Sequence, residues 1–207
     1  MDLYLFDFDK TLYAYDFRKR LPELSVITGA SQYHLAKTWW AGGYERRAES
    51  GEWPTPDEYF AEFERVTGAA LTLRDYQESR KLASIPIPQS VAALAHAATL
   101  GTVSVLSNNP SPFAVSLPVL APDVFAVVGG NVLVSSELGV RKPKPEAYRL
   151  ALEHYGARAE DAFFADDSLE NVEGARELGI TGHHLTYVDG VPQTDALLGA
   201  IERFSQR

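Results

Sequence analysis

Acidic side chains follow the first apolar segment of this sequence at a spacing suited to chemistry. Asp7 and Asp9 lie at the end of the run Leu3–Phe8, which has the composition of a buried strand. Two carboxylates this close repel each other and raise one pKa unless a cation lies between them. The pair therefore suggests a Mg²⁺ site, a nucleophile with a general acid, or both. A helix cap with a solvated turn is the structural alternative.

Three later segments carry further polar groups that chemistry could use. A second apolar run ends in Ser107, Asn108 and Asn109, which offer a hydroxyl and two amides to the oxygens of an anion. Lys142 stands before two prolines that stiffen its loop, and a lysine held there could neutralise a phosphate. Asp166 and Asp167 follow another apolar run, and helix capping would explain only one of the two. Taken singly, the serine and the lysine also fit an ordinary turn and a solvated surface.

Alternating strands and helices are expected to position these groups. The expected strands after the first are 103–106, 124–128, 163–165 and 183–187, and the expected helices between them are 89–100, 145–155 and 171–178. Short apolar strands separated by helices imply an α/β fold in which a parallel sheet is covered on both faces. Because ligands bind beyond the carboxyl ends of such strands, the polar groups should meet at one edge of the sheet.

The region 15–85 has a different pattern, which is aromatic, charged and helical in period. Thr55 begins a capping box with proline at the first helical position, a typical helix start. Two closely spaced prolines then form a stiff connection back to the alternating region. We therefore expect an α/β core from residues 1–14 and 86–207, with a small all-helical domain at 15–85.

Aromatic and cationic side chains are frequent in the helical region. They are Trp39, Trp40, Tyr44, Arg46, Arg47 and Trp53. Such groups either contact a sugar or nucleoside, or they pack the interior of the helical region and its solvated surface. The sequence leaves both interpretations open for each of them.

Composition excludes several classes of function. The 207 residues contain 19 Lys and Arg against 28 Asp and Glu, which gives a formal net charge of −9. Without a basic surplus, broad binding to nucleic acid or to an anionic membrane is not expected. The absence of cysteine excludes disulfides, cysteine-based zinc sites and thiol nucleophiles. With an acidic N-terminus and no long apolar stretch, we expect a cytoplasmic protein without a signal peptide or a membrane span.

The four polar segments, in chain order, resemble the motifs of the haloacid dehalogenase superfamily. They are DFDKT, the strand end LSNNP, the loop GVRKPKP and the strand end ADDS. The resemblance covers the whole chain and implies a three-layer Rossmann-like core with a helical cap inserted after the first strand. The segment SGEWPTPDEYFAEF further resembles the cap of small sugar-phosphate phosphatases in that superfamily.

The resemblance assigns a role to each motif residue. It implies that Asp7 is a nucleophile that forms an aspartyl-phosphate and that Asp9 is the general acid and base. Ser107 would hydrogen-bond the transferring phosphoryl group, and Lys142 would orient Asp7. Asp167 would bind Mg²⁺ together with Asp7 and the backbone carbonyl of Asp9.

Further residues are expected at the same site. Asp166 is the second choice as a metal ligand, after its neighbour in the sequence. We also expect Asn108, Thr11 and Arg46 to contact the substrate.

We therefore expect a Mg²⁺-dependent phosphatase of small phosphorylated metabolites, such as sugar phosphates or nucleotides, acting as a monomer or homodimer. The alternatives are a phosphosugar mutase, a dehalogenase-type hydrolase and a catalytically silent scaffold. Asp9 favours the phosphatase over the dehalogenase, because an alkoxide leaving group needs a proton and a halide does not. A scaffold would need none of the motif residues.

Overall fold

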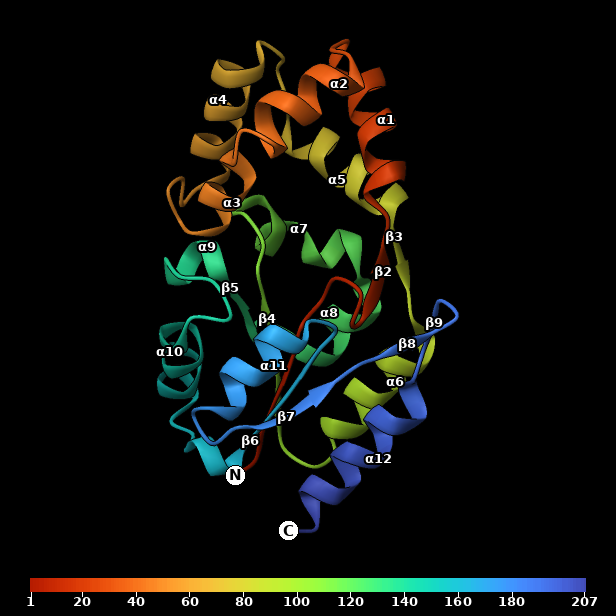
Figure 1. Cartoon of the computed structure of the whole chain (residues 1–207), viewed down its shortest axis with the longest axis vertical. Coiled ribbons are helices and arrows are strands. Elements are labelled where there is room, and N and C mark those ends of the chain that lie inside the picture. Colours follow the sequence, from red (N-terminus) through yellow and green to blue (C-terminus); the bar gives the residue numbers. More distant parts are fainter.

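The computed structural model describes all residues from 1 to 207. Its centre is a parallel sheet with the strand order β5-β4-β1-β6-β7 (Figure 1). The strands are β1 (Leu3–Phe6), β4 (Thr102–Ser107), β5 (Val132–Val134), β6 (Ala162–Asp166) and β7 (Thr181–His184). Because β1 lies between β4 and β6 in parallel register, the carboxyl ends of these three strands meet at one edge of the sheet.

Helices cover both faces of this sheet. One face packs against α6 (Pro88–Ala97), α7 (Pro112–Leu120), α8 (Pro122–Val128) and α12 (Thr194–Ser205). The other face packs against α10 (Pro145–Tyr155) and α11 (Leu169–Arg176). The expected three-layer α/β fold is therefore confirmed. Shorter elements complete it: α9 (Ser135–Leu138), the 3₁₀ turn η2 (Ala159–Asp161) and the hairpin β8 (Tyr187–Val188) with β9 (Val191–Pro192).

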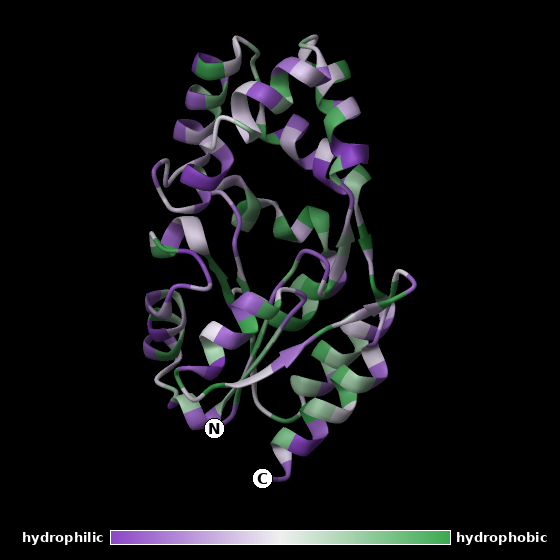
Figure 2. Cartoon of the chain, viewed as in Figure 1, coloured by the Kyte–Doolittle hydropathy of each residue, from purple (hydrophilic) through white to green (hydrophobic).

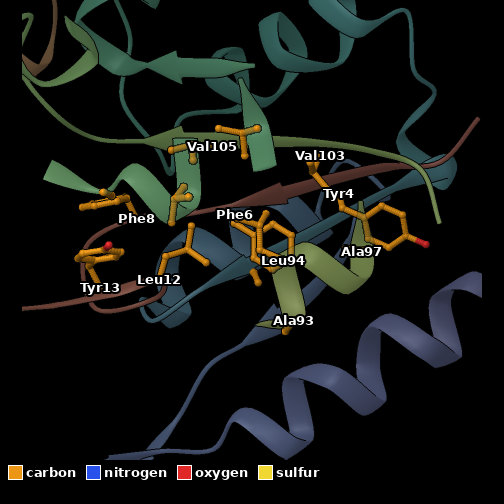
Figure 3. Close-up of a cluster of buried hydrophobic side chains, with 14 of the residues drawn as sticks. Tyr4, Phe6, Phe8, Leu12, Tyr13, Ala93, Leu94, Ala97, Val103 and Val105 are labelled. Atoms are coloured by element: carbon orange, nitrogen blue, oxygen red, sulfur yellow. The ribbon is translucent and has the colours of Figure 1, made fainter. Parts of the chain in front are cut away.

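The two faces are built by alternate residues of the strands, as the period of two in a strand requires. Tyr4 and Phe6 of β1 point to the first face, where Leu94 of α6 packs beside them (Figure 3). Leu3 and Leu5 point to the second face. Helices α6 and α12 correspondingly mix hydrophobic and hydrophilic residues along their length (Figure 2). None of the helices is long and apolar enough to cross a bilayer.

A helical segment, residues 17–83, is inserted between two short strands and lies at the top of Figure 1. Strands β2 (Tyr13–Tyr15) and β3 (Ser84–Pro86) pair antiparallel at its base. The segment contains α1 (Phe17–Thr28), α2 (Gln32–Leu35), the π-helical turn η1 (Ala36–Trp40), α3 (Tyr44–Glu49), α4 (Pro56–Thr67) and α5 (Leu73–Ala83).

The helical segment has an apolar core of its own. Trp39 is fully buried at its centre and packs against Tyr59 and Phe63 of α4. Thr55 caps α4 through the expected capping box, with its side chain and that of Glu58 bonding each other's backbone. Trp39 is thus a packing residue of the helical segment.

One predicted strand is wrong. Residues 124–128 belong to α8, which begins at Pro122. The third strand of the sheet in chain order is instead β5. Val124 and Val128 lie four residues apart and are both buried, which is the spacing of a helix face. A short apolar run fits a buried helix as well as a buried strand, so its composition alone did not distinguish them. The predicted strand at 183–187 is also displaced, because β7 ends at His184.

Candidate active site

The carboxyl ends of the three central strands bring the acidic motif residues together. Asp7 follows β1, and its backbone N–H donates to the carbonyl of Ala165 at 2.9 Å. Ser107 ends β4 and Asp166 ends β6. The loop after α9 then carries Lys142 into the same place from a distant part of the chain.

Lys142 is the centre of this arrangement. Its ammonium donates to Asp7 Oδ1 at 2.8 Å, to Asp166 Oδ2 at 2.7 Å and to the carbonyl of Leu106 at 2.7 Å. Only 1% of its side chain is exposed, so all three of its donors need the partners they have. Burial alone would lower the pKa of Lys142, but the two carboxylates outweigh burial and raise it above its ordinary value. Lys142 is therefore held in its charged form.

Asp7 has one engaged and one unengaged oxygen. Its Oδ1 accepts from Lys142 and, at 3.0 Å, from the hydroxyl of Ser107, whereas its Oδ2 has no hydrogen-bond partner. Burial raises the pKa of Asp7 to about 7, although the charge of Lys142 opposes this. A carboxylate oriented through one oxygen and unengaged at the other is suited to nucleophilic attack or to metal binding.

The two neighbouring aspartates after β6 differ in their surroundings. Asp166 is fully buried and accepts from Lys142, from Asn171 Nδ2 at 3.0 Å and from the backbone N–H of Ser168 at 2.8 Å. Asp167 is partly buried, and no side chain donates to its carboxylate. Burial raises the pKa of Asp167, and the adjacent Asp166 adds to this. Asp166 therefore has no oxygen without a partner, whereas Asp167 offers its carboxylate to a ligand.

Three carboxylates at this edge could hold a metal ion. One oxygen from each of Asp7, Asp166 and Asp167 lies within 4.8 Å of the others. Lys142 supplies one positive charge against three negative ones, so the cluster is unfavourable unless a further cation binds. Carboxylate oxygens are the hard ligands that Mg²⁺ prefers. The residues present therefore fit the expected magnesium.

Asn108 and Thr11 support the loops around the site. The amide of Asn108 donates to the carbonyl of Lys142 and accepts from its N–H, both at 3.0 Å. Thr11 is fully buried, and its hydroxyl accepts from the N–H of Asp167 at 3.1 Å. Both side chains thus fix the backbone of motif residues. Because Thr11 is fully buried, it does not present its side chain to a substrate in this structure. Asn108 lines the pocket described below.

Asp9 is hydrogen-bonded to the helical segment and not to Lys142. Nη2 of Arg80, near the end of α5, lies 2.9 Å and 3.0 Å from its two carboxylate oxygens. Asn109 bridges the two parts of the site, since its Nδ2 is 3.1 Å from both Asp9 Oδ2 and the hydroxyl of Ser107. Arg80 was assigned no role from the sequence.

A pocket of about 260 Å³ opens beside Asp9, between the sheet edge and the helical segment. It is lined by Asp9, Tyr15, Phe17, Arg20, Trp40, Glu45, Glu49, Arg80, Asn108 and Asn109. Trp40 thus faces the pocket. Arg46 does not line this pocket. It lines a separate groove of about 120 Å³ beside the loop 139–144, which Lys142 also lines, so its expected contact with substrate stays a prediction.

A second ion pair joins the helical segment to the motif loop. Arg141 directly precedes Lys142, and its Nε lies 2.7 Å from a carboxylate oxygen of Glu49. Burial raises the pKa of Glu49 to about 7, although Arg141 opposes this. The pocket is therefore bordered on two sides by contacts between sheet edge and helical segment.

Comparisons with known proteins agree with this architecture. The family model described as haloacid dehalogenase-like hydrolase matches residues 1–179. Phosphatase MT3486 of Mycobacterium tuberculosis is 28% identical over 213 residues, covering 95% of this chain and 94% of that protein. The sesquiterpene phosphatase astK of Aspergillus oryzae is 40% identical over 56 residues, which span only 29% of its length.

Solved structures share the fold. A predicted HAD-like family hydrolase from Porphyromonas gingivalis has a TM-score of 0.74 at 20% identity, covering 100% of this chain and 98% of that one. The HAD family enzyme bt-2542 of Bacteroides thetaiotaomicron, in complex with magnesium and inorganic phosphate, has a TM-score of 0.70 at 21% identity. That match covers 91% of this chain and 93% of the other.

Proposed function

The chain belongs to the haloacid dehalogenase-like hydrolases, and on that premise we propose that it is a Mg²⁺-dependent phosphatase of small phosphorylated metabolites. The observation that carries the proposal is the geometry of Asp7. One of its oxygens is fixed by Lys142 and Ser107 while the other is unengaged, and Asp9 lies two residues further on beside a pocket. A nucleophile with a neighbouring acid is what hydrolysis through a covalent intermediate requires.

Mg²⁺ would be held by Asp7, Asp167 and the backbone carbonyl of Asp9. Asp166 accepts a hydrogen bond from Lys142 and would lie next to these ligands. When bound, the ion would offset the charge of the phosphate and of the carboxylates around it. The remaining chemistry belongs to side chains of this chain.

In the first half of the reaction, Asp7 Oδ2 attacks phosphorus and the bond from phosphorus to the ester oxygen breaks. Lys142 and Ser107 keep Asp7 oriented, and the positive charge of Lys142 offsets the negative charge that develops on the phosphoryl group. The leaving alkoxide takes a proton from Asp9, which must have left Arg80 and taken up a proton from solvent before this step. Because Asp9 is paired with Arg80 here, this ion pair has to open when a substrate binds.

In the second half, Asp9 takes a proton from water, and the water oxygen attacks phosphorus of the aspartyl-phosphate. The bond from phosphorus to Asp7 breaks, so inorganic phosphate leaves and the carboxylate is regenerated. The same residue thus serves first as acid and then as base.

Asp9 also separates the proposal from its alternatives. A dehalogenase-type hydrolase releases halide without protonation and has no use for a second acid. A scaffold needs neither the buried lysine nor the unengaged carboxylate oxygen. A phosphosugar mutase would use the same side chains, and measured phosphate release distinguishes it from a phosphatase.

The helical segment is proposed to act as a cap that admits substrate and then excludes water. It contributes one wall of the pocket and meets the sheet edge through Arg80 and Glu49. Sugar phosphates and nucleotides are the candidate substrates. The relatives support the proposal, since two are named phosphatases and a structural neighbour binds magnesium and phosphate.

The test is phosphate release by the purified chain with Mg²⁺ across sugar phosphates, nucleotides and phosphorylated acids. Asp7→Asn should abolish release, whereas Asp57→Asn, an exposed change on α4, should leave it unchanged. Intact-mass analysis of a rapidly quenched reaction should find one phosphoryl group on the wild type and none on Asp7→Asn. Undiminished turnover by Asp7→Asn would contradict the proposal.

A further inference from the structure

Two buried guanidinium groups face the pocket beside Asp9. Arg20 on α1 and Arg80 on α5 each expose only 2% of their surface, yet both line this pocket. Burying an arginine is unfavourable unless its charge and its donors are satisfied. The partners of Arg20 and Arg80 within the protein therefore indicate how much of their charge is left for a ligand to neutralise.

Arg20 has no carboxylate at close range. Its Nη1 is 3.9 Å from Glu45 Oε1 and 3.4 Å from the hydroxyl of Tyr15, and its Nε has no hydrogen-bond partner. The other oxygen of Glu45 is already used, since it accepts from Trp39 Nε1 at 2.5 Å and from Tyr59 at 2.9 Å. The charge of Arg20 is therefore only loosely compensated.

Arg80 is satisfied only in part. Its Nη2 meets Asp9, but its Nε has no hydrogen-bond partner. Its guanidinium lies 4.5 Å from the ring centroid of Tyr15 and 5.4 Å from that of Phe113. Aromatic packing fixes the plane of the group, and its Nη1 donates to no protein group, so Nη1 is the donor left for a ligand.

The remaining acid of the pocket does not compensate these arginines. Glu49 is paired with Arg141 on the motif loop. Of the two arginines, only Arg80 thus has a close carboxylate, that of Asp9, whereas Arg20 has Glu45 at 3.9 Å. A planar anion fits such a pair, because guanidinium donors match a carboxylate in a fixed, bidentate geometry.

We propose that Arg20 and Arg80 form a subsite for a carboxylate on the leaving group, so that the preferred substrates are small phosphorylated hydroxy acids. This proposal rests on the phosphatase function proposed above, and it names the class of ester that the pocket selects. The phosphoryl group would lie at Asp7, and the carboxylate would reach the two arginines across the pocket.

The size of the pocket limits the acid. Its volume of about 260 Å³ lies below the range of roughly 300–1,000 Å³ usual for drug-sized ligands. Phe17 and Trp40 add apolar surface to its wall. A short acid, including a small sugar acid, fits this description better than a nucleoside does.

Matched pairs of esters test the subsite. We would measure kcat/KM with Mg²⁺ for 2-phosphoglycolate against ethyl phosphate, and for 3-phosphoglycerate against glycerol 3-phosphate. The wild type should favour the acid of each pair by about 10- to 100-fold, as expected for hydrogen bonds between charged groups. Arg20→Gln and Arg80→Gln should each reduce this preference, and Arg20→Lys should retain part of it because the charge remains.

Matched control variants lie on the same helices. Arg18→Gln on α1 and Arg74→Gln on α5 change side chains that are 90% and 86% exposed, so they should leave the preference unchanged. Melting temperatures and hydrolysis of p-nitrophenyl phosphate would show that each variant is folded and active.

Inhibition by phosphonates measures binding without the chemical step. 3-Phosphonopropionate should inhibit the wild type more strongly than propylphosphonate does, and Arg20→Gln should remove the difference. Equal kcat/KM values within each ester pair, with equal inhibition by the two phosphonates, would overturn the subsite while leaving the phosphatase function intact. Failure to hydrolyse any ester, p-nitrophenyl phosphate included, would instead overturn the proposed phosphatase function.

Discussion

The guanidinium of Arg80 lies 2.9 Å and 3.0 Å from the two carboxylate oxygens of Asp9, although 71 residues separate them in the chain. The ion pair is almost closed to water, since only 3% of the Arg80 side chain and 23% of the Asp9 side chain are exposed. It joins the last helix of the helical segment directly to the loop that carries the proposed nucleophile. The proposed acid is therefore in contact with the part of the molecule that is expected to select the substrate.

Replacing Asp9 should affect substrates according to their leaving groups. Asp9→Asn should slow hydrolysis of alkyl phosphates by roughly 10²–10⁴-fold, the usual contribution of a general acid or base. The loss should be smaller for p-nitrophenyl phosphate, whose leaving group needs little protonation. Steady-state rates for both esters provide the measurement, and equal losses for the two would contradict the acid role.

Magnesium should be required for turnover and should also stabilise the fold. EDTA is expected to abolish activity, and Mg²⁺ at 100 times its Kd should add about 2.7 kcal/mol to the free energy of unfolding. Asp167→Asn should lose most of this stabilisation because it removes a carboxylate to which no side chain donates. Asp195→Asn, an exposed change on α12, is the control. Thermal melts with and without the metal would decide the matter, and an unshifted wild-type melt would count against the site.

Removing the buried ammonium should destabilise the metal-free protein. Lys142→Met leaves Asp7 and Asp166 buried without their shared cation, which typically costs about 3–5 kcal/mol. Lys144→Met changes an exposed lysine two residues away and should cost little. Denaturant unfolding of both variants in EDTA gives the comparison. Equal stabilities would mean that the ammonium is not the partner that these carboxylates require.

Glu49 should make stability depend on pH. Burial raises its pKa to about 7 from an ordinary value of 4.5, so the folded protein binds more protons than the unfolded chain between these values. Its contribution to stability is present below pH 4.5 and is lost as the pH rises through 7, by an amount on the order of 3 kcal/mol.

The comparison that checks this is between the wild type and Glu49→Gln, whose side chain does not titrate. The wild type should lose stability relative to the variant when the pH is raised from 5 to 8. A constant difference in their free energies of unfolding across this range would argue against a raised pKa.

Two residues of the helical segment should differ in their effect on specificity. Trp40 lines the pocket beside Asp9, whereas Arg46 lines a separate groove. Trp40→Ala should therefore change kcat/KM by different factors for different phosphate esters, and Arg46→Ala should change it by smaller factors. A kinetic series on both variants, with circular dichroism as a check on folding, tests this. A uniform loss for Trp40→Ala would assign that side chain to packing alone.

The features that the sequence predicts well are those with local causes. The capping box at Thr55 and the strand ends at Asp7, Ser107 and Asp166 depend on neighbours in the chain or on a simple apolar run. Parallel strands then bring their ends together, so the acidic cluster and Lys142 could be expected at one edge.

The features that the sequence does not predict have causes distant in the chain. Arg80 follows no motif, and its burial against Asp9 results from the way α5 returns to the sheet edge. Arg20 resembles any other arginine of α1 until its burial is known. The helix at 122–128 was missed because an apolar run of that length lacks a distinguishing period.

The antiparallel pairing of β2 with β3 has a consequence for protein engineering. Tyr15 pairs with Ser84, so the chain leaves the core and returns to it at adjacent points. A short turn could therefore close the gap in place of residues 17–83, and an equivalent set of helices from a relative could be grafted onto the same two strands. Since loop closure over so small a gap costs little, the sheet and its acidic edge should tolerate such an exchange. This base is thus a natural junction for building chimaeras that combine one catalytic edge with different recognition surfaces.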